Sequence, residues 1–402
     1  MSHLSYLEKL LDGVDVEWKP LDDISVKISS GGTPKTGVAE FYDGDIPWLR
    51  TQEVNFDEIW DTGVKITEAG VDNSSAKWIP ANCVIVAMYG ATVGKIGINK
   101  IPMTTNQACA NIQLDGNIAN YRYVFHFLLS QYEYIKSLGS GSQTNINAGI
   151  VKKLVVPIPC PDNPEKSLAI QAEIVRILDA FTAMTAELTA ELTAELNMRK
   201  KQYNYYRGQL LSFEEGEVEW KTLGDLAENL DSKRKPITSG LREAGEIPYY
   251  GASGIVDYVK DYIFDGDYLL VSEDGANLLA RNTPIAFSIS GKTWVNNHAH
   301  VLKFETYAER KYVEYYLNSI DLTPYISGAA QPKLNKKNLE SINIPNPAPK
   351  EKERIVAILD KFDSLTCSIK EGLPREIELR QKQYEYYRDL LLSFPKSEEA
   401  VA

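Results

Sequence analysis

The chain has 402 residues, of which 44% are hydrophobic, 10% aromatic and 24% charged. This composition excludes a wholly disordered protein, and the length suffices for two to four domains of about 100 to 200 residues each. The formal net charge of −12 excludes a uniformly basic surface that would bind nucleic acid indiscriminately, so any contact with DNA must be local.

Neither a membrane span nor a signal peptide is evident in the sequence. No run of aliphatic residues and methionine is longer than Val84–Met88, whereas crossing a bilayer takes about 20 apolar residues. The segment Met1–Ser5 has no basic stretch followed by an apolar one. The cysteines lack C-x-x-C spacing, which is typical of reduced thiols in a cytoplasm and not of a zinc site or a disulfide framework.

The two halves of the chain share a repeated frame. Ile174–Phe181 recurs as Ile355–Phe362, and Gln202–Phe213 recurs as Gln383–Phe394, in both cases 181 positions later. Tyr6–Leu11 resembles the C-terminal end of either repeat. Since it also stands just before a V-E-W segment, the order of the repeated segments is cyclic. The sequences between the matched positions are unlike. The other matched pairs are the glutamines Gln143 and Gln331, the prolines Pro157 and Pro345, and the V-E-W segments at Trp18 and Trp220. Each V-E-W segment stands at the start of one half and is called its opener.

This frame divides the chain into six segments. They are an N-terminal helical segment (1–14), a first globular domain (15–166), a first long helix (167–212), a second globular domain (213–349), a second long helix (350–394) and a tail (395–402). A proline precedes each long helix. Since proline fits a first helical turn but not a helix interior, these prolines mark the entry to each helix.

The first globular domain contains two basic islands in an otherwise acidic chain. Asn73–Leu114 and Ile135–Pro161 each have three lysines and no carboxylate, and the second includes the amide-rich segment Gly139–Asn147. Amide side chains pair with adenine edges in the major groove and lysines hold phosphates, although a polar surface loop has the same composition. The candidate DNA-binding residues in this half are Lys35, Arg50, Gln52, Lys95, Gln143, Asn145, Asn147, Lys152 and Lys153.

The first long helix has a heptad pattern that is interrupted by three identical tetrads, T-A-E-L, at 185–196. The insertion of four residues is a stutter that locally unwinds a supercoil. One interpretation of the tetrads is a low-complexity helix that needs no function, since Ala, Glu and Leu are strong helix formers. The other is a spacer, since each tetrad adds about 6 Å and a net turn of about 40°. The candidate spacer residues are Thr185, Leu188, Thr189, Leu192, Thr193 and Leu196.

The second globular domain repeats the basic islands at corresponding places. Gly275–Phe304 and Leu322–Leu339 have no carboxylate, and the second contains the polar segment Ser327–Asn335. Recurrence beside the matched glutamines places a shared role in DNA binding about level with two unrelated surface loops, so both interpretations stay open. The candidate DNA-binding residues in this half are Lys233, Arg234, Lys292, Gln331, Lys333, Asn335, Lys336 and Lys337.

Sites for catalysis are not convincing in this sequence. Ala286–Thr293 fits a relaxed phosphate-loop pattern, but that loop requires a helix after its lysine, whereas Trp294–Val301 has the pattern of a strand. His298 and His300 could share a strand face but have no third metal ligand. No D/N-P-P-Y/F tetrad of an adenine methyltransferase is present. We therefore expect a recognition protein with no catalytic residue and no metal site.

The second long helix repeats the heptad steps and the stutter of the first, so we expect the two helices to pack on each other. It differs by having Gly372 and Pro374 near its middle. Proline inside a helix removes a hydrogen bond and clashes with the preceding turn. The sequence therefore predicts a kink or a break there, either as a hinge or as a plain irregularity.

Two unlike globular halves, two similar helices, a cyclic repeat and the tetrads together resemble the DNA-specificity (S) subunit of type I restriction-modification enzymes, in particular the type IC family. The resemblance covers the whole length and is most specific at the tetrads, the repeated helix ends and the openers. It implies an α+β fold in which two mixed α/β target-recognition domains are joined by two long antiparallel coiled-coil helices, with a pseudo-two-fold internal repeat.

The resemblance also implies a function in a bacterial restriction system. Each domain reads one half of a bipartite double-stranded DNA target, and the tetrad count sets the number of unread base pairs between the halves. Two modification (methyltransferase) subunits bind S-adenosylmethionine and methylate adenine, and two restriction (motor and nuclease) subunits use ATP and Mg. The resemblance implies no cofactor in this chain, no membrane contact and a cytoplasmic location.

The alternative from another functional class is a non-enzymatic interaction scaffold, in which a duplicated domain binds protein or glycan and the coiled coil forms a stalk. A specific DNA reader loses affinity steeply with salt and depends on sequence, whereas a scaffold does neither.

Overall fold

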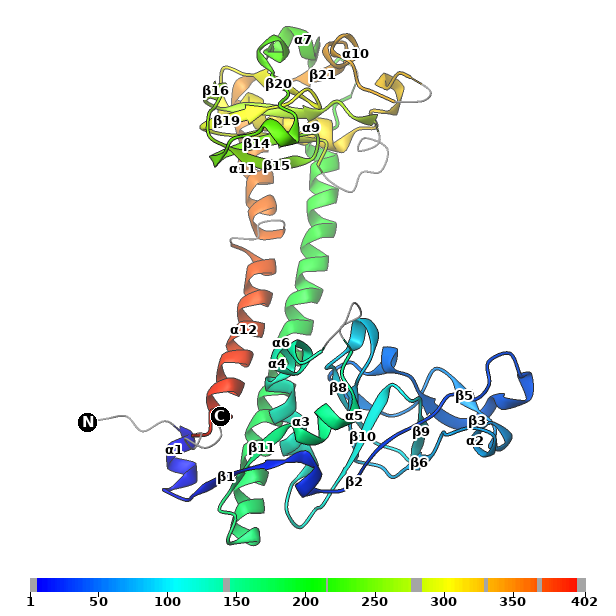
Figure 1. Ribbon diagram of the computed structural model, residues 1–402. Coiled ribbons are helices and arrows are strands. Elements are labelled where there is room, and N and C mark those ends of the chain that lie inside the picture. The colour runs from blue at the N-terminus through cyan, green and yellow to red at the C-terminus, as the bar shows by residue number, and fades with distance from the viewer. Residues whose placement is uncertain are drawn as a thin grey trace. The chain divides into compact units, whose positions relative to one another are not determined.

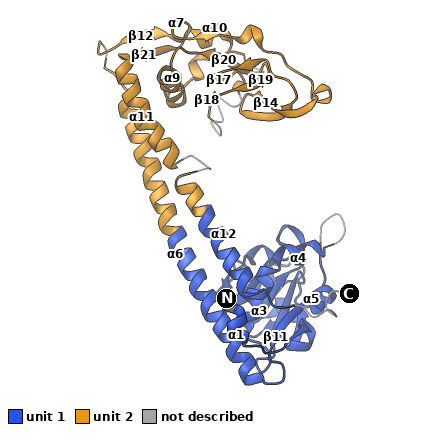
Figure 2. Cartoon of the chain, turned by 90° about the vertical axis from the view of Figure 1, so that its left-hand side faces the viewer, with its two compact units in different colours: residues 1–189, 378–402 blue, residues 190–377 orange. Residues whose placement is uncertain are grey.

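The computed structural model describes residues 6–139, 145–214, 216–275, 284–328, 332–366 and 371–395. The chain forms two compact units, one made of Met1–Thr189 with Glu378–Ala402 and the other of Ala190–Ile377 (Figure 2). Each unit therefore contains one globular domain and parts of the long helices, because the longest helix, α6 (Pro164–Leu210), contributes residues to both.

The first unit is built on two sheets and a short strand pair (Figure 1). Strand order is β2-β10-β7-β8-β4 in the larger sheet and β5-β3-β9-β6 in the smaller one, and β1 pairs with β11. All four residues of β7 are buried, so this strand is covered on both faces. The elements are α1 (Tyr6–Leu11), β1 (Val16–Pro20), β2 (Ser25–Ser30), β3 (Tyr42–Leu49), β4 (Glu58–Ile59), β5 (Lys65–Ile66), α2 (Glu68–Asp72), β6 (Trp78–Ile79), β7 (Val84–Ala87), β8 (Ile96–Asn99), β9 (Met103–Thr105), β10 (Cys109–Leu114), α3 (Tyr121–Ser130), α4 (Tyr132–Ser137), α5 (Ala148–Lys153) and β11 (Val155–Pro159).

The second unit has a related plan with two four-stranded sheets and one strand pair. The strand orders are β13-β20-β17-β18 and β15-β14-β19-β16, and β12 pairs with β21. The elements are β12 (Glu219–Thr222), α7 (Leu223–Leu226), β13 (Glu228–Asn229), β14 (Ala244–Gly251), β15 (Gly254–Val259), β16 (Phe264–Asp265), β17 (Tyr268–Ser272), β18 (Ala286–Ile289), β19 (Lys292–Val295), β20 (Ala299–Lys303), α9 (Tyr307–Ser319), α10 (Lys336–Glu340), β21 (Asn343–Asn346) and α11 (Pro349–Thr366).

The repeated openers form the first strand of each domain. β1 pairs antiparallel with β11, with Trp18 opposite Pro157. β12 pairs antiparallel with β21 in the same way, with Trp220 opposite Pro345. The matched tryptophans and prolines of the sequence therefore lie opposite each other in a strand pair that precedes the long helix of each half.

The long helices pack on each other through repeat-equivalent aromatic residues, as the heptad pattern predicts. In the first unit the rings of Phe181 on α6 and Tyr387 on α12 (Leu373–Leu391) lie 6.0 Å apart between centroids. In the second unit Phe362 on α11 and Tyr206 on α6 stack at 5.7 Å. Since Phe362 and Tyr387 follow Phe181 and Tyr206 by 181 positions, one packing contact occurs once in each unit.

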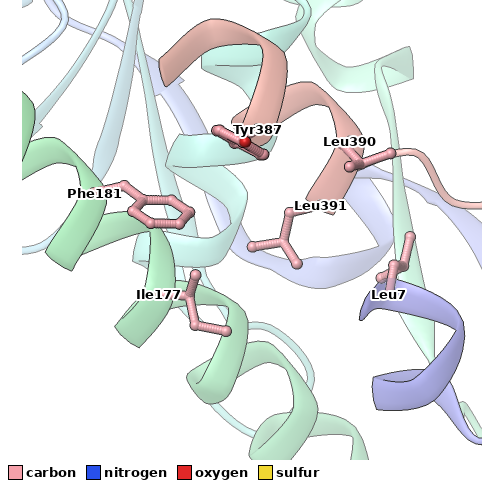
Figure 3. A pocket seen from close by; sticks show the side chains of 6 residues that line it. All are labelled: Leu7, Ile177, Phe181, Tyr387, Leu390 and Leu391. Atoms are coloured by element: carbon pink, nitrogen blue, oxygen red, sulfur yellow. The ribbon is translucent and has the colours of Figure 1, made fainter. Parts of the chain in front are cut away.

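The N-terminal and C-terminal helices meet within the first unit, which explains the cyclic character of the repeat. Leu7 and Leu11 of α1 share a hydrophobic core with Leu391 at the end of α12, and the indole Nε1 of Trp18 donates to the Pro395 carbonyl at 3.0 Å. An apolar pocket of about 340 Å³ lies between α1, α6 and α12. Figure 3 shows the side chains that line it. It is lined by Leu7, Ile177, Phe181, Tyr387, Leu390 and Leu391.

The second long helix is broken, as Gly372 and Pro374 predict. Helix α11 ends at Thr366 and α12 begins at Leu373. Gly372 has a φ of +82°, and a Cβ atom there would lie 2.4 Å from the Ser364 carbonyl oxygen. Pro374 lies in the first turn of α12, where proline costs no helical hydrogen bond. The glycine, not the proline, therefore fixes the conformation at the break, and the single helix expected at 350–394 is two helices.

Substitution of Gly372 by alanine is expected to destabilise the second unit by about 1 to 3 kcal/mol, because a side chain is strained at positive φ and meets backbone oxygens. Thermal or urea unfolding of the purified protein measures this loss. Gly208→Ala is the matched control, because a Cβ atom there has no neighbour within 4 Å. We expect that control to be neutral or stabilising, and equal stability of both variants would contradict the role of Gly372.

Two of the expected free thiols are buried in the first unit. Cys83 and Cys109 form no disulfide, and burial raises the pKa of each thiol to about 12. Cys160 is half-buried. Within the described ranges, no helix combines the length and hydropathy that a membrane span requires.

Candidate nucleic-acid interface

In the first unit the described end of the amide-rich segment, Asn145–Asn147, lies against the loop that follows the buried strand β7. The side-chain oxygen of Asn145 accepts from the Gly90 amide at 3.1 Å, and the Ile146 amide donates to the Met88 carbonyl at 3.0 Å. Gln143 lies outside the described residues. Two loops separated by more than fifty residues in the sequence therefore form one surface.

The second unit has the corresponding arrangement at β17. The Leu334 amide donates to the Glu273 carbonyl at 3.0 Å, and the Gly275 amide donates to the Pro332 carbonyl at 2.7 Å. Lys333 and Ser327 also exchange two backbone hydrogen bonds of 2.8 and 2.9 Å. Gln331, like Gln143, lies outside the described residues. In each half the described residues of the polar segment thus lie beside the residues that follow a buried central strand.

Asn147 and Asn335 cap short helices at repeat-equivalent positions. The Asn147 side-chain oxygen accepts from the Ile150 amide at 3.0 Å at the start of α5. The Asn335 side-chain oxygen accepts from the Asn338 amide at 3.0 Å at the start of α10. An N-cap asparagine satisfies a helix amide that has no intrahelical partner. Capping is therefore a structural reason for the matched asparagines, and the sequence interpretation overlooked it.

The candidate lysines differ in their availability to phosphate. Lys152 pairs with Asp22 at 3.0 Å and Lys336 pairs with Glu340 at 3.6 Å, while Lys333 lies 3.4 Å from Glu273. Lys95 donates to the Asn55 side chain at 2.7 Å. The exposed candidates are Lys35, Lys153, Lys233, Lys292, Lys336 and Lys337, together with Gln52 and the two capping asparagines.

Two candidate arginines have protein partners. The guanidinium of Arg234 contacts Asp231, Glu273 and the Ala299 carbonyl, and its side chain is only 14% exposed. This placement favours a structural role over phosphate contact. Arg50 is half-buried and pairs with Glu53 at 3.2 Å.

Arg234 belongs to a buried polar network that supports the polar segment of the second domain. The Asp231 carboxylate lies 2.6 Å from His300 Nδ1, and His300 Nε2 lies 2.7 Å from the Leu334 carbonyl oxygen. Burial alone would raise the pKa of Asp231, but hydrogen bonds from His300 and the Val301 amide, together with the Arg234 charge, hold it below its ordinary value. The network connects β20 to the segment that contains Leu334.

The structure disfavours the two catalytic alternatives for this region. Lys292 and Thr293 begin strand β19 and not a helix, so no helix N-terminus faces a phosphate-loop position. His300 is buried in the network just described, and His298 pairs with Asp274 at 3.0 Å. Among the described residues, no group of three His, Cys, Asp or Glu side chains is placed to hold a metal ion.

The three tetrads lie within the continuous helix α6. The side chains of their leucines are half-buried, and so are Thr185 and Thr189, whereas Thr193 is exposed. Any residues added to or removed from this stretch therefore change the length of an unbroken helix. The candidate spacer residues at these positions are Thr185, Leu188, Thr189, Leu192, Thr193 and Leu196.

Comparison with known proteins identifies the family. The type I restriction modification DNA specificity domain matches residues 13–198 and 215–379. The specificity subunit of the Escherichia coli type I restriction enzyme EcoR124I/EcoR124II is 40% identical, with 99% of each chain covered. That of EcoprrI, also from Escherichia coli, is 40% identical, with 92% of this chain and 93% of the relative covered. A putative specificity subunit from Haemophilus influenzae is 32% identical over 97% of this chain and 98% of the relative.

Solved structures of low sequence identity share the fold. A solved structure that concerns complex assembly and conformational transition of the type I R-M system has a TM-score of 0.65 at 15% identity. The match covers 94% of this chain and 97% of that chain. The HsdS subunit from Thermoanaerobacter tengcongensis has a TM-score of 0.51 at 15% identity, covering 94% of this chain and 95% of that chain. Because the family model matches both halves and the two Escherichia coli relatives are 40% identical, the chain belongs to the family of type I restriction-modification DNA specificity proteins, and each of its halves carries one copy of the family's domain.

Proposed function

We propose that the chain is the specificity subunit of a type I restriction-modification complex and that each domain reads one half of a bipartite DNA target. The observation that carries this proposal is the duplicated surface, in which the described residues of a polar segment lie against the residues that follow a buried strand in both halves. The residues of these surfaces differ between the halves, as is required if the two domains bind different DNA sequences. Amide and hydroxyl groups there can address base edges, while exposed lysines contact phosphates.

Catalysis belongs to partner subunits in this proposal. Two modification subunits carry S-adenosylmethionine and methylate adenine, and two restriction subunits carry ATP and Mg and act as motor and nuclease. Recognition is then the contribution of this chain. Its net charge of −12 is compatible with this arrangement if the partners supply much of the surface that neutralises phosphates.

The tetrads act as the spacer between the two half-sites in this proposal. One tetrad lengthens a helix by about 6 Å and turns it by a net angle of about 40°. One base pair turns DNA by about 34 to 36° and lengthens it by about 3.4 Å. The net rotation of one tetrad is close to that of one base pair, whereas the two lengths differ. A change of one tetrad therefore matches the change in the angle between half-sites better than the change in their distance.

Replacement of Lys153 or Lys337 by alanine is expected to weaken DNA binding at all sequences alike. Each side chain is exposed near a polar segment, and loss of one phosphate contact should reduce the slope of log affinity against log salt by about one. Fluorescence anisotropy over a salt series measures both quantities. Lys200→Ala on α6 is the control and should change neither. An effect confined to one DNA sequence would contradict the assignment of these lysines to phosphate.

Selection from random duplex DNA tests the proposed function against the scaffold alternative. The chain assembled with modification subunits should enrich one split motif with a constant gap, and its binding should fall steeply with salt. Absence of any enriched motif, with weak salt dependence, would instead support the scaffold.

A further inference from the structure

Each long helix carries two polar residues that bind its own globular domain at repeat-equivalent positions. They are Gln171 and Asp179 on α6, and Lys352 and Asp360 on α11, each pair 181 positions apart between the helices. We call these four the attachment residues. The two on one helix are separated by eight residues, which corresponds to about 12 Å along the helix axis. Each domain is therefore held at two separated points.

In the first unit the attachment residues bind α3 and the residue that caps its N-terminus. Both oxygens of Asp179 accept from the guanidinium of Arg122, at 2.8 Å each, and His126 Nε2 lies 2.7 Å from the same carboxylate. The fully buried Gln171 accepts from the Asn120 amide at 2.8 Å. Arg122 also pairs with a glutamate of β4, so this contact continues from the helix into the sheet of the domain.

In the second unit the attachment residues bind α9 through different chemistry. The phenol of Tyr315 donates to Asp360 at 2.6 Å and that of Tyr307 donates at 2.9 Å. Lys352, whose side chain is 6% exposed, lies 3.7 Å from Glu309. The positions on the long helix are thus the same in both units, while the donors in the domain differ.

The protonation states favour these contacts at neutral pH. Burial would raise the pKa of Asp179, but hydrogen bonds from His126 and Arg122 lower it to about 2, so the carboxylate is ionised. Burial and the hydrogen bond to Asp360 raise the pKa of Tyr307 to about 12, so the phenol keeps its proton. Hydrogen bonds to an ionised partner are shorter and stronger than those between neutral groups.

We propose that Asp179 and Asp360 are positioning residues, which fix the orientation of each recognition domain on its helix and thereby restrict the complex to one gap between half-sites. Hydrophobic packing between helix and domain is non-directional, whereas charge-assisted hydrogen bonds at two separated points oppose rotation about either one. The inference rests on the proposed function, since it concerns how the length of the spacer determines the placement of the two domains. The tetrads set the length of the spacer, and these carboxylates couple each domain to it.

The test uses the assembled methyltransferase complex and a library of duplexes that carry both half-sites at every gap around the preferred one. Asp360→Ala removes the carboxylate, and the double variant Tyr307→Phe with Tyr315→Phe removes its donors while keeping the rings. Glu353→Ala is the matched control, because Glu353 is an exposed carboxylate on the same helix. Methylation at each gap is measured by sequencing.

We expect both variants to keep the half-site sequences and to raise methylation at neighbouring gaps about tenfold relative to the preferred gap, while Glu353→Ala keeps a single gap. A single gap in all variants would overturn the inference. So would unfolding of the second domain in both variants by near-UV circular dichroism, because the contacts would then maintain the domain and not its orientation. A wild-type complex without any constant gap would instead refute the proposed function.

Discussion

Removal of one tetrad, Thr189–Leu192, is expected to leave both half-sites unchanged and to shorten the preferred gap by one base pair. The tetrads are identical, so the deletion joins Leu188 to Thr193 and preserves the helical sequence at the junction. The helix loses about 6 Å and about 40° of net rotation, and removal of one base pair reduces the angle between half-sites by a similar amount. Sites with the original gap should therefore lose methylation.

The measurement is methylation of duplexes with each gap by the complex that contains the deletion variant. Glu191→Gln serves as the control, because it changes the charge of an exposed residue within the tetrads without changing the helix length. An unchanged gap in the deletion variant would refute the spacer hypothesis. A change of either half-site sequence would show that the tetrads affect recognition itself.

Replacement of Asp231 by alanine is expected to destabilise the second unit by about 3 to 5 kcal/mol, because removal of one member of a buried ionic network leaves its partners without compensation. The Asp231 side chain is 7% exposed and contacts both Arg234 and His300. Urea unfolding measures the loss. Recognition of the second half-site should fail while the first domain keeps its own preference.

The same network predicts how stability depends on pH. The pKa of Asp231 is lower in the folded protein than its ordinary value of 3.8, so its contribution is complete above about pH 4 and is lost as the pH falls through the lowered pKa. The stability difference between wild type and Asp231→Ala should therefore shrink in acid. Asp257→Ala is the control, since the Asp257 side chain is 42% exposed where it pairs with Arg242, and little change is expected there. Equal stability of the two variants would contradict the assigned role.

Internal repetition made much of the frame predictable from sequence alone. The openers form strands, the heptads form packed helices, and Gly372 marks a break. These features depend on local patterns or on comparison of one half with the other. The first long helix nevertheless begins at Pro164, a few residues before the expected boundary, because helix ends are set by cap geometry and not by the heptad pattern.

The candidate interface was less predictable because its partners are distant in sequence. Asn145 meets Gly90, and Leu334 meets Glu273, through contacts that no local pattern encodes. A basic run suggested Arg234 as a phosphate ligand, but tertiary folding brings Glu273 to its guanidinium. The N-cap signals were present in the sequence, as asparagine before a short helical segment.

Adenine methylation mapped across a genome by single-molecule sequencing tests the central claim most directly. Cells that contain this chain and a type IC modification subunit are compared with cells that lack the chain. The account predicts a new split motif with a constant gap, which also names both half-targets. No new methylation, with the complex shown to assemble, would contradict the claim that the chain directs methylation to a bipartite sequence.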